Sequence, residues 1–363
     1  MRAAASPRAD RTPARLAALL LALSSPLLKP GLPVQAAPVA PPGPAPQRPL
    51  QVQEPVQVPV PLKLNAEQQR VHDASMAAVR ADPDAWIRRY LLHSSRRVGA
   101  GGQLLDPGSD NLAAVMRRGP LTINVDDARD LFPAYAADRQ SRSLHADSVH
   151  EASLLISELL WERALNQAVG RRDLVLFTGG GAASGKTWAL RHSPEVQALM
   201  PRVQIIQDST MANQRRASQR LQQALASGRS VRVIYVFTPI EQAVSWLVAR
   251  GMEHGRSLPA AAMARSHWRS QQTVLALADR HRSDPRVRID LLINRPNAPG
   301  RLQPIEDLRR LKLSAAAHYP SEQAFSRHVL GLVHRNLVLR HEDADPADPT
   351  PTLEDSLLGD DGS

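Results

Sequence analysis

The sequence contains no cysteine, which excludes disulfide bonds and thiolate metal sites. This absence leaves the compartment open, because exported proteins do not need disulfides. Aromatic residues are scarce, at 4%, and no basic run is interleaved with them, so we expect no specific nucleic-acid partner. The formal net charge of +10 comes mostly from scattered arginines. Arginines that converge on a phosphorylated ligand would account for part of this excess.

The amino-terminal apolar run LAALLLALSSPLL, which begins at Leu16, is too short to cross a bilayer as a mature helix. It follows an arginine-studded start and precedes a small-residue site near Ala36 and Ala37. This layout is typical of a secretory signal peptide over residues 1–37. We therefore expect an exported protein with no membrane contact in its mature form. The alternative is a disordered Ala/Pro-rich extension on a cytoplasmic protein.

Composition divides the rest of the chain into four parts. Residues 38–62 are rich in proline and favour an extended spacer. Residues 63–119 give helical patterns and predict a small helical lead-in. The main domain is expected at 120–340, and residues 341–363 are acidic and Pro-punctuated, as in a solvated disordered tail.

Within the main domain, short apolar runs alternate with amphipathic segments. The runs begin at residues 121, 174, 203, 231 and 286. This alternation predicts an α/β fold with three layers and a mostly parallel sheet. One predicted helix stops at Gly228, where a C-cap is expected. Another is predicted to begin with a capping box formed by Thr238 and Glu241, with Pro239 at its first position.

The segment GGAASGKT follows the second run directly and precedes a helix-compatible stretch. It fits the phosphate-binding pattern G-x-x-x-x-G-K-[ST], and the strand before it and the helix after it make the match specific. A glycine-rich turn that only resembles the motif is the alternative. The predicted nucleotide-binding residues are Gly180, Gly181, Ala182, Ala183, Ser184, Gly185, Lys186 and Thr187.

These residue types suit the binding of a nucleoside triphosphate. The glycines permit a backbone loop whose N–H groups surround phosphate oxygens. Lys186 adds a point charge at the terminal phosphates, and the Thr187 hydroxyl is offered to a magnesium ion that bridges the same oxygens. The sequence therefore predicts ATP and Mg2+ as cofactors.

Two other strand ends carry acidic residues. Asp126 and Asp127 follow the first run, and Asp208 follows the third. In a parallel sheet these ends lie at the edge that holds the phosphate loop. One of the first pair could act as a catalytic base, with capping of a helix as the alternative. Asp208 could position the metal or cap a helix.

Arg250 and Arg256 lie at a helix end and in the loop that follows it. Arginines so placed can neutralise charge on a transferred phosphoryl group, so both are predicted to be catalytic. The alternative is that they are surface residues of an arginine-rich chain.

Over residues 121–297 the chain resembles the zeta toxin family of P-loop kinases. The resemblance rests on VDDARDLFPAY, VHEAS, GGAASGKT, DST, GRSLP and INRPN. It implies that Asp126 is the base and that Arg250 and Arg256 clamp the phosphates; whether Asp127 is the base instead stays open. It also implies that three residues line the substrate pocket: Arg129, Glu151 and Thr210.

The order of the segments departs from the family, because in typical zeta toxins the phosphate loop precedes the aspartate segment. Here Asp126 comes first, which puts the carry-over of Glu151 in doubt. The resemblance implies a toxin or effector that phosphorylates a nucleotide sugar such as UDP-N-acetylglucosamine, with a possible antitoxin or immunity protein as partner. NAD kinase-like and polynucleotide kinase activities are alternatives, as is a non-catalytic nucleotide-binding module.

Overall fold

The computed structural model describes residues 64–97, 111–295, 300–341 and 357. The predicted signal peptide and linker lie outside these residues, as does the acidic tail apart from His341 and Leu357. Within the described part of the chain, no helix has the length and hydropathy that a membrane crossing requires.

The core is a six-stranded sheet in the order β1-β3-β2-β4-β5-β6. Its strands are β1 (Leu121–Asn124), β2 (Leu174–Gly179), β3 (Val203–Asp208), β4 (Ser230–Phe237), β5 (Val287–Ile293) and β6 (Leu302–Pro304). The first five pair in parallel, and they match the five predicted runs. β6 pairs antiparallel with β5; its three residues are too few for a recognisable apolar pattern.

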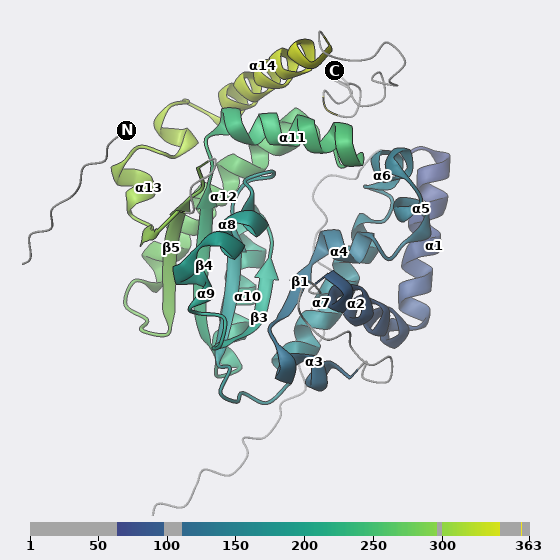
Figure 1. Ribbon diagram of the computed structural model, residues 1–363, viewed down its shortest axis with the longest axis vertical. Helices are drawn as coiled ribbons and strands as arrows, with labels where there is room; N and C mark the ends of the chain where they lie inside the picture. Colours follow the sequence, from purple (N-terminus) through teal and green to yellow (C-terminus); the bar gives the residue numbers. More distant parts are fainter. Residues whose placement is uncertain (1–63, 98–110, 296–299, 342–356, 358–363) are drawn as a thin grey trace, which may run out of the picture. The chain divides into compact units, whose positions relative to one another are not determined.

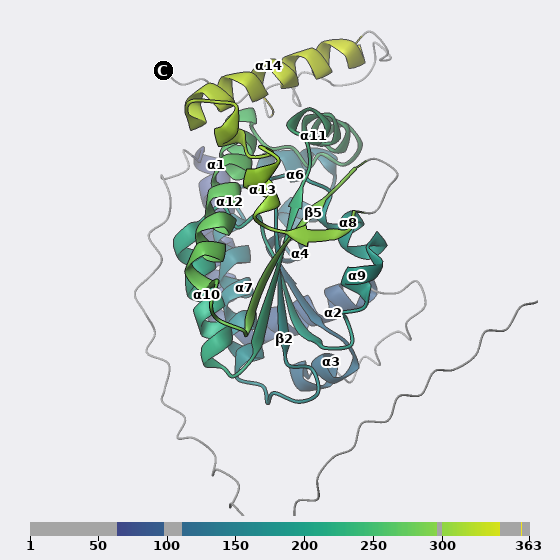
Figure 2. The same ribbon diagram turned by 90° about the vertical axis from the view of Figure 1, so that its left-hand side faces the viewer.

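Helices cover both faces of the sheet and make the predicted third layer (Figure 2). On one face, Val175 and Phe177 share a core with α7 (His150–Leu165), α10 (Gln214–Ala226) and α12 (Ala260–His281). On the other, Leu174 and Leu176 pack against α8 (Lys186–His192) and α9 (Pro194–Gln197). This alternation follows from the two-residue period of a strand. The architecture is that of a P-loop kinase-like α/β fold.

A separate apolar cluster joins α11 (Ile240–His254), α12 and α14 (Glu322–His341). Figure 1 shows α14 beside α11. Ala182 and Ala183 of the predicted phosphate loop pack against this cluster. Two short elements lie between β6 and α14: α13 (Asp307–Arg310) and a 3-10 turn (Ala315–Ala317).

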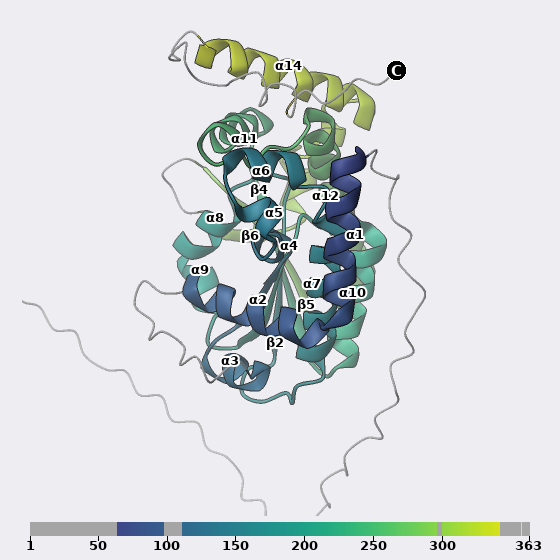
Figure 3. The same cartoon turned by 90° about the vertical axis from the view of Figure 1, so that its right-hand side faces the viewer.

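The lead-in consists of α1 (Ala66–Ala81), α2 (Pro83–Arg97) and α3 (Leu112–Arg118), and α1 and α2 lie nearest the viewer in Figure 3. The Tyr90 hydroxyl of α2 donates to the Thr122 carbonyl at 3.1 Å and accepts from the Asn124 N–H at 2.9 Å. Both partners belong to β1, whose other side pairs with β3. Three short helices, α4 (Val125–Arg129), α5 (Pro133–Ala136) and α6 (Arg139–His145), connect β1 to α7.

Candidate active site

The carboxyl ends of β1, β3 and β2 meet at one edge of the sheet. Asn124 is in register with Asp208, which is in register with Thr178. The Asp126 segment follows β1 and the glycine-rich loop follows β2, so both emerge at this edge. The structure therefore brings together the two segments that the proposed chemistry requires.

Close approach of neighbouring atoms explains two glycines of the loop. Gly180 has φ of +142°, and a Cβ there would lie 2.6 Å from the Val236 carbonyl oxygen. Gly185 has φ of +68°, and its Cβ would lie 2.5 Å from the Asn294 amide nitrogen. An L side chain at either position would be strained and crowded. The backbone can therefore turn in a space too small for side chains.

Two residues anchor the second half of the loop. The Ser184 carbonyl accepts from the Thr238 hydroxyl at 2.8 Å and from the Asn294 amide at 2.9 Å. The predicted capping role of Thr238 is wrong, because α11 begins after Pro239 without a side-chain cap. Thr238 and Asn294 each follow a strand directly, and that position was the sequence signal for a loop anchor.

Lys186 and Thr187 occupy the start of α8. The Lys186 ammonium lies 3.5 Å from the Gly180 carbonyl, so its side chain spans the mouth of the loop. Thr187 is exposed in the first turn of the helix. The residues present fit a bound triphosphate: a backbone cradle, one ammonium and one accessible hydroxyl.

Asp126 and Asp127 lie in the first turn of α4, where the N-cap is Asn124. The Asn124 side chain accepts from the Asp126 N–H at 2.8 Å. The alternative in which an aspartate caps this helix is therefore wrong. The Asp127 side chain is buried, whereas that of Asp126 is 43% exposed.

Four cationic side chains act on the Asp126 carboxylate. Its partial burial opposes ionisation, but the charges of Arg129, Arg256, Arg250 and Lys186 outweigh this effect and lower its pKa. The Arg129 guanidinium also donates to it at 3.1 Å. Asp126 is thus ionised at neutral pH, and the charges of the loop lysine and of the two predicted phosphate-binding arginines act on it.

Arg250 and Arg256 are fixed where α11 ends. The helix stops at Gly255, which has φ of +67°, and the Arg250 side chain donates to the Arg256 carbonyl at 3.3 Å. Burial lowers the pKa of Arg250. It opposes the charge on Arg256, but Asp126 and a hydrogen bond with Tyr135 outweigh it and raise that pKa. Among the described residues, the buried Nη2 of Arg256 has no hydrogen-bond partner.

Sequence reasoning missed His150, which contacts Arg129, and Arg216, whose charge acts on His150. The Arg129 guanidinium donates to Nδ1 of His150 at 2.7 Å. Burial, together with the charges of Arg129 and Arg216, lowers the pKa of His150 to about 3, so this imidazole is neutral at physiological pH. Arg216 lies in the first turn of α10 and forms an ion pair with Glu158. The sequence signal was weak, although His150 directly precedes the predicted Glu151.

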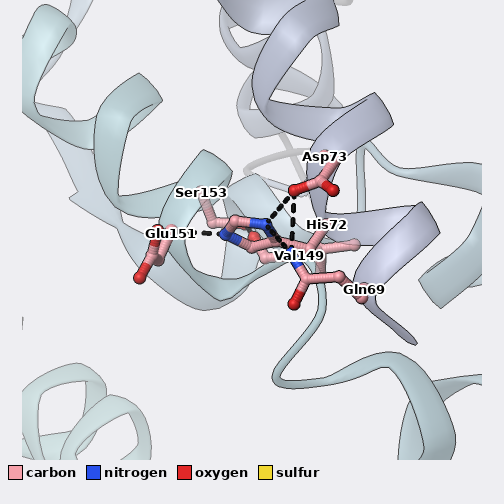
Figure 4. Close-up of polar contacts among 6 residues, drawn as sticks. All are labelled: Gln69, His72, Asp73, Val149, Glu151 and Ser153. Carbon is pink, nitrogen blue, oxygen red and sulfur yellow. Dashed lines mark hydrogen bonds and ion pairs between the residues drawn. The ribbon is translucent and has the colours of Figure 1, made fainter. Parts of the chain in front are cut away.

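The predicted substrate residues Glu151 and Thr210 have different surroundings. Figure 4 shows His72 of α1 between Asp73 and Glu151. His72 contacts Asp73 at 2.9 Å through Nδ1 and Glu151 at 3.0 Å through Nε2. Thr210 lies beside the loop, because its carbonyl accepts from the Gly180 N–H at 3.4 Å. Glu151 thus connects the site region to the lead-in, and its predicted substrate contact stays a prediction.

Asp208 joins the three strand ends. Its carboxylate accepts from the Thr178 hydroxyl at 2.6 Å and from the Asn124 amide at 2.9 Å. The capping alternative is wrong, because Asn213 caps α10. The described residues contain no group of three or more His, Asp or Glu side chains that could hold a metal ion. A magnesium ion here would therefore depend on phosphate oxygens, with Thr187 and the free lone pairs of Asp208 as further partners.

Comparison with known protein families gives a match, which covers part of this site. Residues 188–297 match the Zeta toxin family, which confirms the resemblance for less than a third of the chain. The match begins directly after Thr187 and includes Asp208, Thr210, Arg250 and Arg256. It does not include Asp126 or Glu151.

Two solved structures of AvrRxo1-ORF1 with AvrRxo1-ORF2 have low similarity to the chain. A native complex is 14% identical with a TM-score of 0.32, and covers 57% of this chain and 85% of that one. A complex with sulphate ions is 15% identical with a TM-score of 0.38, and covers 81% of this chain and 86% of that one. No curated protein matches the sequence.

Proposed function

We propose that this protein is an ATP-dependent kinase that phosphorylates an alcohol group on a small nucleotide-type substrate. One arrangement carries the proposal: the Asp126 segment and the phosphate loop emerge at the same edge of the sheet, where the charges of Arg129, Arg256, Arg250 and Lys186 act on the Asp126 carboxylate. This arrangement combines an acceptor for a hydroxyl proton with cations for phosphate oxygens. The family match over residues 188–297 supports the same reaction class.

The loop and the start of α8 would hold the triphosphate. Backbone N–H groups between Gly180 and Thr187 would bind the phosphate oxygens, with Lys186 at the terminal phosphates. Mg2+, when bound, would neutralise charge on these oxygens. Thr187 would hold this ion directly, and Asp208 through a water molecule.

Asp126 would orient the acceptor hydroxyl and receive its proton. A carboxylate with a lowered pKa is a weak base, which suits a loose phosphoryl-transfer transition state in which the proton is lost late. Arg250 and Arg256 would stabilise the charge on the transferred group. The unpartnered Nη2 of Arg256 is a donor available for this contact.

The acceptor is proposed to be a nucleotide sugar such as UDP-N-acetylglucosamine, with Arg129, Glu151 and Thr210 at its pocket. The neutral His150 contacts Arg129, and the charge of Arg216 acts on His150, so both side chains affect this region electrostatically. In this proposal the site is that of a zeta toxin, with the Asp126 segment placed before the phosphate loop in the chain.

Growth inhibition is the biological role that we propose, with the protein acting as a toxin or delivered effector and an antitoxin or immunity protein as its partner. Residues 1–37 would direct export. A reporter fused to these residues should leave the cell; retention of the reporter would favour a cytoplasmic toxin instead.

The proposal is tested by incubating the protein with labelled ATP and a metabolite extract, and identifying the labelled product. Asp126→Asn should lower transfer by about 10²–10⁴-fold, as expected for loss of a general base, while ATP binding persists. Asp127→Asn is the matched control and should keep its activity. If the labelled product is a nucleic-acid end or phosphorylated NAD, the proposed nucleotide-sugar acceptor is wrong. ATP binding without any phosphate transfer would indicate a non-catalytic module.

A further inference from the structure

Two consecutive residues of α12 hold the first half of the phosphate loop. The Ala182 N–H donates to the Ser266 hydroxyl at 2.9 Å, and the Ala182 carbonyl lies 2.8 Å from Nε2 of His267. Ser266 is 8% exposed and His267 is 3% exposed. Both polar groups of one loop residue are therefore taken by buried side chains of a helix 84 residues away.

The chemistry of these contacts fixes their polarity. A carbonyl can only accept, so Nε2 of His267 carries the proton and donates. The Ser266 hydroxyl donates to the Met263 carbonyl at 2.7 Å, which leaves its oxygen to accept from Ala182. Burial and the charge of Lys186 lower the pKa of His267 to about 4. The donating, neutral imidazole is thus the form present at physiological pH.

Gly181 completes the contact from the loop side. A Cβ on Gly181 would overlap the His267 ring at Cγ, Cδ2 and Nε2. The φ of Gly181 is not in the left-handed region, so its backbone could accept an alanine. The space taken by the imidazole, rather than the backbone conformation, is what requires glycine here.

We propose that Ser266 and His267 are positioning residues that set the phosphate loop in its nucleotide-binding conformation before ATP arrives. This inference rests on the proposed function, in which the loop binds ATP. With Ala182 held on both sides and Ser184 held by Thr238 and Asn294, the loop is fixed at two points. The N–H groups between and after these points then already point toward the phosphate site, so ATP binding does not lose free energy to ordering of the loop.

Removal of the His267 donor without loss of volume tests the proposal. His267→Leu should weaken ATP binding by about 10-fold, as expected for an unsatisfied buried carbonyl, with kcat at saturating ATP and KM for the acceptor little changed. His267→Gln, which keeps a donor near Nε2, should recover most of the affinity. A merely structural role predicts equal loss of melting temperature in both variants and unchanged ATP affinity of the folded protein, which would overturn the proposal.

Gly181→Ala gives an independent test by a double-mutant cycle. Alone it should weaken ATP binding, because the added methyl group displaces the loop. In the His267→Ala variant the methyl group has room. The loss of ATP affinity in the double variant should therefore be about 10-fold smaller than the product of the losses in the two single variants. Additive effects would mean that the ring does not position Gly181, and would contradict the proposal.

Hydrogen exchange without nucleotide separates this inference from the proposed function. His267→Leu and Ser266→Ala should speed amide exchange across residues 180–187, with exchange in β4 unchanged. If the wild-type protein fails to bind ATP, the proposed function is lost, whereas exchange still reports on the contact. If the wild-type protein binds ATP and neither variant changes loop exchange or affinity, the inference alone is lost.

Discussion

Arginines that are buried or half-buried occur at both ends of the sheet, and their partners differ. At the amino end, Arg229 is 1% exposed and donates to five oxygens. These are the carbonyls of Ala164, Leu165 and Gln167, the Gln204 side chain and the Ser227 hydroxyl. At the carboxyl end, Arg129 and Arg256 surround one carboxylate, and the described residues provide no partner for Nε of Arg129 or Nη2 of Arg256.

The contrast separates two uses of one side chain. Arg229 satisfies the last carbonyls of α7, which helix geometry leaves without intrahelical donors. Its donors are all committed to fixed acceptors, so it stabilises the fold and has nothing to offer a ligand. The arginines around Asp126 have N–H donors without a partner among the described residues. Their positive charges also repel one another, which lowers the stability of the folded protein unless an anion binds. Unpartnered donors around a shared carboxylate are therefore the stronger sign of a phosphate site.

The largest expected effect is on catalysis at the carboxyl end. Arg256→Ala should lower kcat for phosphate transfer by about 10²–10³-fold, because a donor to the transferred group is lost. The free energy of unfolding should change by less than about 0.5 kcal/mol. Steady-state kinetics and urea denaturation measure the two quantities. Exposed Arg171, replaced by alanine, is the control; a large stability loss in the Arg256 variant would break the comparison.

The reverse result is expected at the amino end. Arg229→Met should lower the free energy of unfolding by on the order of 3 kcal/mol, because buried carbonyls lose their donors. The folded fraction should keep its kcat. Urea denaturation with Arg171→Met as the matched control gives the comparison. Unchanged stability would mean that water or rearranged side chains replace Arg229 without cost.

A third prediction concerns the acid side of the pH profile. Cations lower the pKa of Asp126 below its usual range, so its ionised form persists through neutral pH. Its contribution to stability is present above about pH 4, the usual carboxyl range, and is lost as pH falls through the lowered pKa. Arg129→Gln removes the largest of these cationic influences, so the acidic limb of kcat/KM should move to higher pH. If the acidic limb of the kcat/KM profile does not move, a group other than Asp126 is responsible for it.

The smallest effect is expected at an ordinary ion pair of the lead-in. Burial opposes the charge on His72, but Asp73 and Glu151 outweigh it and raise the pKa above 6.5. The stabilisation is therefore complete below pH 6.5 and is lost as pH rises through the raised folded-state pKa. His72→Gln should cost less than about 1 kcal/mol at pH 6 and still less at pH 8.5. Thermal melts at both pH values check the sign, and a cost that grows with pH would contradict it.

The sequence predicted the fold well because its signals were local. Each parallel strand was an apolar run of at least four residues, and the strand ends placed the loop and Asp126 at one edge by topology alone. Gly228 has φ of +82° just after α10, as its predicted place at a helix end requires. β6 was missed because three edge residues carry no period.

Residues that hold the site were harder to predict because their partners are remote in the chain. Asn294 contacts Ser184 across 110 residues, and Ser266 contacts Ala182 across 84. A serine or histidine inside an amphipathic helix has no pattern that reveals such a partner. Thr238 was assigned to the nearest helix for the same reason, although its hydroxyl bonds to the loop instead.

The Tyr90 contact with β1 has a consequence for the outer edge of the sheet. One phenol hydroxyl occupies the backbone groups of Thr122 and Asn124 that a further strand would otherwise use. A chain trimmed to begin at residue 120 would expose the unpaired backbone groups of β1, and strands of other molecules of the protein could pair with them. The helix that carries Tyr90 thus covers the edge of the strand that leads into the Asp126 segment.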